Sequence, residues 1–276
     1  MSAKYTVVEN LGRHWALHGT KPLGAVGVSG IRTYLYPFFT PGGACVLQEQ
    51  PPDHAHHQGI MVGQDFLNGH NFWAMGHVRY PLNLQHQEKI EHTTDDEDDA
   101  GVTIVQRLRW ATKDGQAVIN EERRTRFEVW DGAHFAEVTS IWIAAFGPVH
   151  IGQTKEGGLG MRVHPQLETF WGGTIRSSAG KTGEKGVFDT LADWVEVSGQ
   201  AEGRLVGIVM MPHPSQKAVP WFVRDYGLHL YTPHRHAPGQ IAAGGTLSLR
   251  VGFVAYDGKS DGAQADRAWQ AYRARA

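Results

Sequence analysis

The feature that most constrains the fold is a stretch of short strand-like runs separated by tight-turn dipeptides. Between residues 101 and 147 three such runs are divided by Asp114-Gly115 and Asp131-Gly132. Asp-Gly pairs favour two-residue hairpin turns, because glycine and aspartate tolerate the positive φ angles that such turns need. Three consecutive runs joined in this way predict an antiparallel meander.

The side-chain pattern within these runs indicates strands with one buried face and one solvated face, since side chains alternate along a strand. In the first run, apolar residues share one parity: Val102, Ile104, Leu108 and Trp110. In the second run, charged residues share one parity: Glu122, Arg124, Arg126 and Glu128. We therefore expect a buried face on one side of the meander and cross-strand charge pairs on the other.

The remaining secondary-structure signals favour an all-β fold. Short runs rich in β-branched or aromatic residues and bounded by Gly or Pro occur at 43–50, 203–211, 226–233 and 245–256. Helical spacing appears only near the end, with Asp261 as the expected N-cap followed by Ala265, Ala268, Trp269 and Tyr272. This pattern predicts a large antiparallel β-sandwich with a short C-terminal helix, and a mutarotase-like supersandwich is one such arrangement. Because no repeat or linker divides the chain, we expect a single domain over residues 1–276.

Composition excludes several function classes. Cys45 is the only cysteine, so no intramolecular disulfide or cysteine-rich zinc site can form. With 26 basic and 28 acidic side chains, the net charge is −2, and no basic cluster interleaved with aromatics indicates nucleic-acid binding. The N-terminus lacks a secretory leader, and no segment reaches the roughly 18 apolar residues of a membrane span. We therefore expect a soluble, cytoplasmic protein, with the acidic run from Asp95 to Asp99 at a solvated loop tip.

Histidine is unusually frequent, with 16 residues in the chain, and four polar side chains crowd one short segment: Asp53, His54, His56 and His57. On an extended backbone His54 and His56 would point to the same side, about 6–7 Å apart, and could share a divalent metal. The alternative is that these histidines make ordinary hydrogen bonds near a strand end. The pattern alone leaves a metal open.

Two further segments combine charged groups with aromatic or glycine residues. Lys155 and Glu156 precede Gly157-Gly158, and such a pair can supply an acid and a base at a glycine turn, or form a solvated surface turn. Residues 213–236 contain Trp and Tyr, whose faces can stack on sugar rings, together with an Arg-Asp pair that could bind hydroxyl groups or pair internally.

These three segments together resemble the motifs of a bacterial family labelled PmoA, also catalogued as DUF6807. The similar stretches, in order, are PDHAHHQGIMVGQDFLNGHNFW, TKEGGLGMRV and HPSQKAVPWFVRDYG, and the resemblance runs from about Pro37 to Tyr256. The resemblance implies an antiparallel β-sandwich and a role in carbohydrate metabolism, without an established reaction. The label PmoA is also that of a methane monooxygenase subunit, which is a membrane protein. That activity is not implied here, since no segment can span a bilayer.

The matching residues form three sets. The first motif matches at Asp53, His54, His56, His57, Asn68, Gly69, Phe72 and Trp73, the second at Lys155, Glu156, Gly157, Gly158 and Arg162, and the third at His213, Pro214, Trp221, Arg224, Asp225, Tyr226 and Gly227. Two positions depart from the family pattern. Gln153 stands where an Asp is usual, and Pro233-His234 replaces a Pro-Phe-Gly ending.

Three functional hypotheses follow, and the expected partner is a small-molecule carbohydrate. The first is a sugar-acting isomerase, lyase or hydrolase. Its expected catalytic residues are His54, His56, His57, Lys155, Glu156 and His213, and its expected substrate-binding residues are Asn68, Trp73, Arg162, Trp221, Arg224, Asp225, Tyr226 and His234. The second hypothesis is a non-catalytic carbohydrate-binding module.

The third hypothesis is a metal-dependent oxygenase on a cupin-like barrel, in which Glu156 and His213 would join His54 and His56 around one ion. The number of titratable groups in the three motifs favours the enzyme over the binding module. A divalent metal stays an open option as cofactor. Neither the substrate nor the oligomeric state follows from the sequence.

Overall fold

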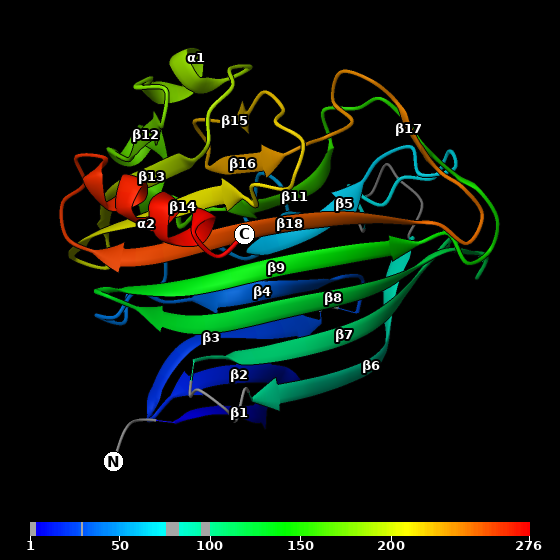
Figure 1. Cartoon of the computed structure of the whole chain (residues 1–276), viewed down its shortest axis with the longest axis horizontal. Helices are drawn as coiled ribbons and strands as arrows, with labels where there is room; N and C mark the ends of the chain where they lie inside the picture. The colour runs from blue at the N-terminus through cyan, green and yellow to red at the C-terminus, as the bar shows by residue number, and fades with distance from the viewer. Residues whose placement is uncertain (1–3, 29, 76–82, 95–99) are drawn as a thin grey trace.

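Two eight-stranded antiparallel sheets pack face to face in the structure, a computed structural model that describes residues 4–28, 30–75, 83–94 and 100–276 (Figure 1). Across sheet one the strands are β1 (Tyr5–Asn10), β2 (Arg13–His18), β3 (Lys21–Val28), β4 (Thr33–Phe38), β5 (Ile60–Gln64), β11 (Gly157–Arg162), β16 (Leu228–Tyr231) and β15 (Phe222–Val223). The acidic run from Asp95 to Asp99 lies outside the described residues.

Sheet two is built mainly from long strands of the middle and the end of the chain. Its order is β12 (Thr174–Ser177), β13 (Val195–Ala201), β14 (Arg204–Pro212), β18 (Thr246–Asp257), β9 (Ala133–Ile143), β8 (Ala117–Trp130), β7 (Val102–Ala111) and β6 (Leu84–Thr94). A separate two-stranded ribbon pairs β10 (Val149–Ile151) with β17 (Gly239–Ile241). The fold class expected from the sequence, an antiparallel β-sandwich with a short C-terminal helix, is confirmed.

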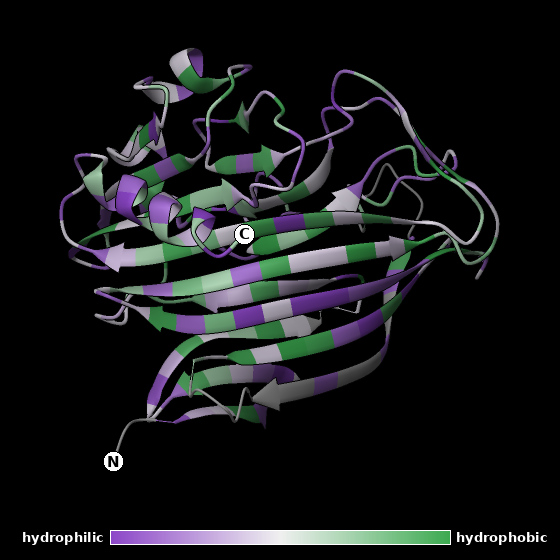
Figure 2. Cartoon of the chain, in the orientation of Figure 1, coloured by the Kyte–Doolittle hydropathy of each residue, from purple (hydrophilic) through white to green (hydrophobic). Residues whose placement is uncertain are grey.

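The predicted meander is strands β7, β8 and β9, paired in sequence order. The apolar parity of β7 is buried, as in Ile104 and Trp110, which are both 0% exposed. Figure 2 shows the resulting alternation of apolar and polar residues along these strands. On the outer face, Glu122 pairs with Arg124 on its own strand at 2.6 Å and faces Arg107 of β7 at 3.9 Å.

One helix covers part of the outer face of the sandwich. Helix α2 (Ala263–Arg273) packs the apolar face that the sequence predicted against the outer face of sheet two. The short helix α1 (Gly183–Val187) and the 3-10 turns η1 (Pro165–Leu167) and η2 (Thr169–Trp171) lie between β11 and β13 in the chain. None of the helices in the described residues is long and apolar enough to cross a membrane.

Two local predictions were wrong in detail. Residues 43–50 form no regular strand, because their backbone groups bond to several different partners, among them Phe38 for Val46 at 3.0 Å and Arg162 for Gln48 at 3.1 Å. The N-cap of α2 is Gly262, not Asp261, although the Asp261 carboxylate does accept a hydrogen bond from the Ala263 amide at 2.9 Å.

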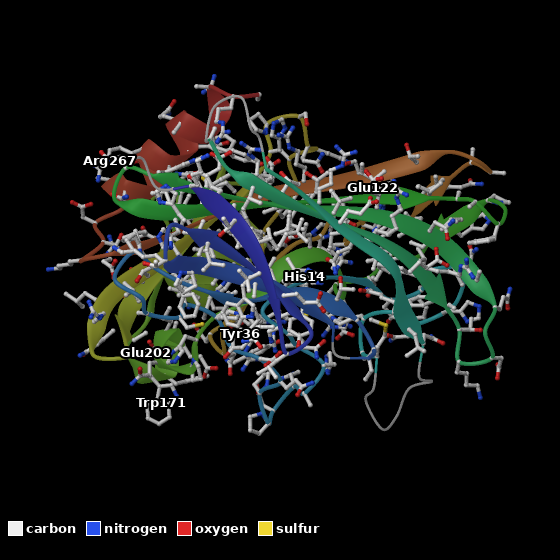
Figure 3. The ribbon with its side chains drawn as sticks, turned by 90° about the horizontal axis from the view of Figure 1, so that it is seen from below. His14, Tyr36, Glu122, Trp171, Glu202 and Arg267 are labelled. Carbon is white, nitrogen blue, oxygen red and sulfur yellow. The ribbon has the colours of Figure 1, made fainter. Side chains whose placement is uncertain are left out.

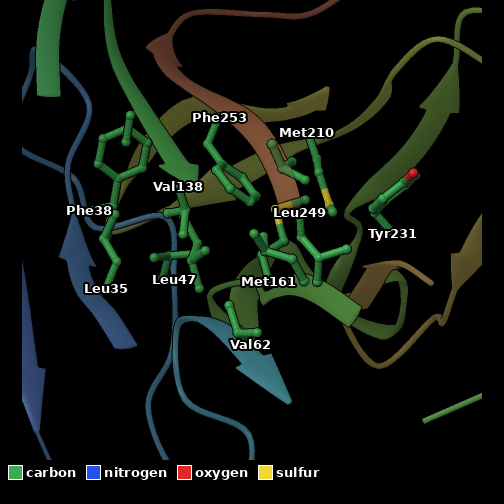
Figure 4. Close-up of a cluster of buried hydrophobic side chains, with 14 of the residues drawn as sticks. Leu35, Phe38, Leu47, Val62, Val138, Met161, Met210, Tyr231, Leu249 and Phe253 are labelled. Atoms are coloured by element: carbon green, nitrogen blue, oxygen red, sulfur yellow. The ribbon is translucent and has the colours of Figure 1, made fainter. Parts of the chain in front are cut away.

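The sandwich core lies between the sheets and is apolar. Figure 4 shows side chains from both sheets meeting there, including Val62 and Met161 of sheet one and Val138 and Phe253 of sheet two. Because side chains alternate along a strand, their sequence neighbours in sheet one face outward. A second apolar cluster covers that outer face, formed by Tyr34, Met61, Trp73, Ala74, Phe222, Leu228 and Leu230.

One ion pair is buried inside the sandwich. Arg123 and Glu121 of β8 have 3% and 0% of their side chains exposed and meet through Nε–Oε1 and Nη2–Oε2 contacts of 2.7 and 2.8 Å. Arg123 also donates to the carbonyl of Thr33 in sheet one at 2.6 Å. Glu121 accepts from the Trp110 indole at 2.7 Å and from the Ser140 hydroxyl at 2.6 Å. This network links the two sheets through fully paired polar groups.

We expect Glu121→Gln to lower the free energy of unfolding by about 3–5 kcal/mol, because Arg123 would keep its charge in the interior without a counter-ion. Urea denaturation measures this change. The neighbouring Glu122→Gln is the matched control, and it should change stability by less than about 1 kcal/mol because its partner Arg124 is exposed. Equal effects of the two substitutions would contradict the role given to the buried pair.

Candidate functional site

A cavity of about 230 Å³ opens on the outer face of sheet one. All three sequence motifs contribute to it. It is lined by His54, His56, His57, Trp73, Ala74, Lys155, Glu156, Phe222, Arg224, Tyr226, Leu228 and Leu230. Eight of the residues predicted from the sequence therefore converge in one pocket, across more than 170 positions of the chain.

The histidine segment is folded into turns, which corrects the extended geometry expected from the sequence. The His54 amide donates to Pro51 at 3.1 Å, and the His57 amide donates to His54 at 2.8 Å. These bonds three residues apart bring His54 and His57 together, with ring centroids 4.7 Å apart and planes 4° from parallel. His56 meets both rings edge-on instead of sharing a face with His54.

Asp53 and His54 form a hydrogen-bonded pair at the pocket. The carboxylate of Asp53 contacts Nδ1 of His54 at 2.8 Å and receives Nη2 of Arg162 at 3.0 and 3.1 Å. Burial acts to raise the pKa of Asp53, but the bonds from His54 and Arg162 outweigh it and leave the pKa below its ordinary value. A charged Asp53 can only accept, so in the neutral form of His54 the proton lies on Nδ1 and the lone pair lies on Nε2.

His57 has the opposite arrangement of its ring nitrogens. Its Nδ1 contacts Nη1 of Arg162 at 3.3 Å, and a guanidinium can only donate. The proton of neutral His57 therefore sits on Nε2. Burial, with His56, His54 and Arg162 nearby, lowers the pKa of His57 strongly. The loop thus supplies a proton acceptor at His54 and a neutral donor at His57.

Arg162 lies beneath the pocket and does not line it, contrary to the substrate-binding role expected from the sequence. Only 2% of its side chain is exposed, and its Nη2 also contacts Glu168 at 3.1 Å. The ring of Tyr226 covers the guanidinium, with 4.9 Å between the ring centroid and the guanidinium carbon. Arg162 is therefore a positioning residue that holds Asp53 and His57.

Lys155 and Glu156 line the pocket directly before β11, which begins with Gly157 and Gly158 and packs closely between its neighbouring strands. Gly158 has φ +95°, and a Cβ there would lie 2.0 Å from the carbonyl oxygen of Tyr231. A Cβ at Gly157 would lie 2.2 Å from the Gln64 side chain. A larger residue at Gly158 would therefore push β11 away from β16, while one at Gly157 would displace the Gln64 side chain of β5. Within the described residues neither Lys155 nor Glu156 forms an ion pair, so both charged groups are available to a ligand.

Arg224 sits at the rim on two aromatic rings. Its guanidinium carbon lies 4.7 Å from the ring centroid of Phe188 and 4.8 Å from that of Phe222. Nη1 donates to Glu184 at 2.7 Å, and the other oxygen of Glu184 accepts from the Asp225 amide at 2.7 Å. Sequence reasoning missed Glu184 and Glu168 because neither belongs to a motif. Phe222 lies within the third motif, but nothing in its pattern singled it out.

Several predicted site residues lie elsewhere. Asn68 accepts from the His150 amide at 2.7 Å and thereby fixes a loop. The Trp221 indole is buried and donates to Ala192 at 2.8 Å. Asp225 contributes backbone bonds beside the pocket and is not among its lining residues, and His234 lines a separate cavity.

His213 is also separated from the pocket. It follows directly after β14 of sheet two and lines a cavity with Lys217 and Trp269, while the rest of the third motif crosses to β15 in sheet one. Its Nδ1 contacts the Ser215 hydroxyl at 2.7 Å. The metal set expected for a cupin-like oxygenase, which needs Glu156 and His213 at one ion, therefore does not converge.

The described ranges of the chain hold no group of three or more His, Cys, Asp or Glu side chains placed to bind a metal ion. His54 and His56 remain neighbours, with ring centroids 5.8 Å apart. Binding of a divalent ion by this pair stays a prediction.

Comparisons with known proteins identify a family and remote likenesses to solved structures. The family described as "Family of unknown function (DUF6807)" matches residues 26–270, and this description does not carry the label PmoA. No curated protein matches the sequence. A galactose mutarotase related enzyme from Lactobacillus acidophilus is 8% identical, with a TM-score of 0.38 over 93% of this chain and 98% of that chain.

A protein from Escherichia coli K12 proposed to be an aldose 1-epimerase is 10% identical, with a TM-score of 0.36 over 92% of this chain and 99% of that chain. These scores are too low to support an argument about function.

A buried histidine behind the site, His229, is held neutral in the folded protein, and this can be tested. His229 of β16 is 0% exposed, and within the described structure neither ring nitrogen has a hydrogen-bond partner. Burial, with Arg162 nearby, lowers its pKa from 6.5 to about 3. Between these values the unfolded chain binds a proton that the folded chain does not, so stability falls as the pH falls from 6.5 to 3.

We expect His229→Leu to remove this contribution, so that the variant loses about 2 kcal/mol less stability than the wild type between pH 6.5 and pH 5. Urea denaturation at a series of pH values measures it. His150→Leu, at an exposed position, is the control for loss of an imidazole. A His229→Leu variant with the acid sensitivity of the wild type would show that His229 is not held neutral.

Proposed function

The chain belongs to the DUF6807 family, whose description assigns no function, so its activity must be inferred from the site, and we propose that it is a carbohydrate-active enzyme. The reaction is of the isomerase, lyase or hydrolase type, with His54 as the base. The observation that carries this proposal is the Asp53–His54 pair, backed by buried Arg162, at a pocket lined by further titratable groups.

The pocket lining matches the two surfaces of a sugar. Trp73, Phe222, Leu228 and Leu230 form an apolar wall, suited to the C–H face of a sugar ring. Lys155, Glu156 and Arg224 lie among the polar lining residues and can bind hydroxyl or carbonyl oxygens. A pocket with both kinds of lining binds and orients a small polyhydroxylated molecule.

The proposed chemistry begins with proton transfer to His54. Its free Nε2 takes a proton from a substrate hydroxyl or from a carbon beside a carbonyl group, while charged Asp53 stabilises the imidazolium that forms. The Nε2 proton of His57 and the ammonium of Lys155 stabilise negative charge on the substrate oxygen. The imidazolium of His54 can return the proton to the product, and the carboxylate of Glu156 can act as a second base that accepts a proton from a substrate hydroxyl. Isomerisation, elimination and hydrolysis can each use such a step.

A non-catalytic binding module is the alternative, favoured by the aromatic rings of Trp73 and Tyr226 at the pocket. Binding alone does not need a histidine whose tautomer is set by a carboxylate. It also does not need a second histidine of opposite tautomer. The enzyme and the binding module differ in whether they turn over a sugar. Exchange of sugar protons with solvent deuterium detects turnover even when the product is unknown.

The test incubates the protein in D₂O with keto-sugars, aldoses and glycosides and follows deuterium uptake and product formation by NMR. We expect turnover of at least one sugar, and a kcat about 10²- to 10⁴-fold lower in His54→Gln because the base is lost. Asp53→Asn should reduce kcat similarly with a smaller change in KM. Asp114→Asn, in the hairpin turn between β7 and β8, is the matched control.

Binding of a sugar without exchange or turnover in the wild type would favour the binding module. Unchanged turnover in His54→Gln would remove His54 from the catalytic role. Circular dichroism and urea denaturation of Asp53→Asn keep a loss of folding apart from a loss of catalysis.

A further inference from the structure

Turn η2, beside the site, presents two large aromatic side chains to solvent. Phe170 is 71% exposed and Trp171 is 73% exposed, and among the large hydrophobic residues that the structure describes only Leu11 is more exposed. Figure 3 shows Trp171 projecting from the same side of the molecule as Tyr36, opposite Arg267. Tyr36 packs against both the core and the outer apolar cluster of sheet one, and Trp171 projects from that side of the molecule.

The backbone that carries these rings is held by several hydrogen bonds. The Trp171 and Gly173 amides donate to the Glu168 carbonyl at 2.9 and 3.1 Å. The Gly172 amide donates to Thr169 at 3.1 Å, and Gly172 adopts φ +94°, which glycine tolerates. The two aromatic residues are therefore presented from a fixed turn.

The same turn is hydrogen-bonded to two residues that lie next to the pocket lining. The Glu168 carboxylate accepts from Arg162, which holds Asp53 and His57. The Thr169 amide donates to the Asp225 carbonyl at 3.0 Å, and Asp225 lies between the pocket residues Arg224 and Tyr226. Phe170 is thus linked to the rim through Thr169, one hydrogen bond and Asp225.

The volume of the pocket indicates which part of a ligand Phe170 and Trp171 could bind. The pocket of about 230 Å³ lies below the roughly 300–1,000 Å³ of sites that enclose drug-sized ligands. It has room for one sugar ring, and a second ring of the same ligand must lie outside it. The platform of Phe170 and Trp171 is positioned to receive that ring.

The platform is too small for a protein partner. Two aromatic side chains bury at most roughly 500 Å² together, whereas a specific protein interface buries about 800 Å² on each partner. The adjoining residues of the turn, His164, Gln166 and Glu168, are polar. A small apolar surface with a polar border fits the C–H face and hydroxyl edge of a sugar ring.

We propose that Phe170 and Trp171 form a second sugar subsite, so that the substrate of the pocket is a glycoside or oligosaccharide and not a free monosaccharide. This inference rests on the proposed sugar-binding function. One ring of the substrate occupies the pocket between His54 and Arg224. The next ring stacks on the aromatic pair, and the glycosidic linkage spans Tyr226 and Asp225.

The test compares dissociation constants, by isothermal titration calorimetry, of glucose, galactose and xylose with those of cellobiose, maltose, lactose and xylobiose. We expect at least one disaccharide to bind about 10-fold more tightly than its monosaccharide. Trp171→Ala should remove about 5- to 10-fold of that advantage and leave monosaccharide affinity unchanged. Phe170→Ala should act in the same direction, and Phe146→Ala, at another exposed aromatic, should have no effect.

Equal affinity for a monosaccharide and its disaccharides, or equal loss of both in Trp171→Ala, would overturn the subsite while leaving the proposed function in place. Absence of any sugar binding would overturn both. Self-association of the wild type that Trp171→Ala abolishes, measured by analytical ultracentrifugation, would assign the aromatic pair to a second copy of the chain and also overturn the subsite.

Discussion

The arrangement of the site depends on the burial of one guanidinium. Arg162 is always charged and almost wholly removed from water, and an unpaired charge in that position would be strongly destabilising. Asp53 and Glu168 must approach it from two separate loops, and His57 and Tyr226 fill the remaining space around it. The geometry of the pocket above, including the tautomers of both histidines, follows from satisfying Arg162.

The second requirement is close contact between the strands under the site. β11 lies between β5 and β16 near the carbonyls of His229 and Tyr231, and it can do so only with glycine at alternate positions on the outward side. The close approach of the strand backbones therefore depends on Gly158 and Gly160.

Local signals in the sequence were sufficient for the parts of the fold that depend on neighbours along the chain. The alternation in β7, the Asp-Gly turns and the apolar spacing of α2 each act within a few residues, and each was predicted correctly. Residues 43–50 have the composition of a strand, but they meet several partners in turn, which only the tertiary arrangement decides. The separation of His213 from Tyr226 has the same cause, because the chain crosses between sheets within that motif.

The site residues were predictable as a set of motifs, while their roles were not. Clustering of His54, His56, His57, Lys155 and Glu156 signalled a polar pocket, and the structure brings these side chains together. The position of Arg162 beneath the pocket could not be predicted. The sequence pattern around an arginine at a strand end is the same whether its side chain is buried or exposed. Glu168 and Glu184 acquire their roles only through the arginines that they pair with.

The apolar cluster on the outer face of sheet one is separate from the core between the sheets. Pocket side chains that belong to neither apolar cluster, such as Lys155 and Glu156, can therefore be exchanged without disturbing the packing that holds the sandwich together. A lineage of such proteins could drift in what it recognises while its architecture stays constant.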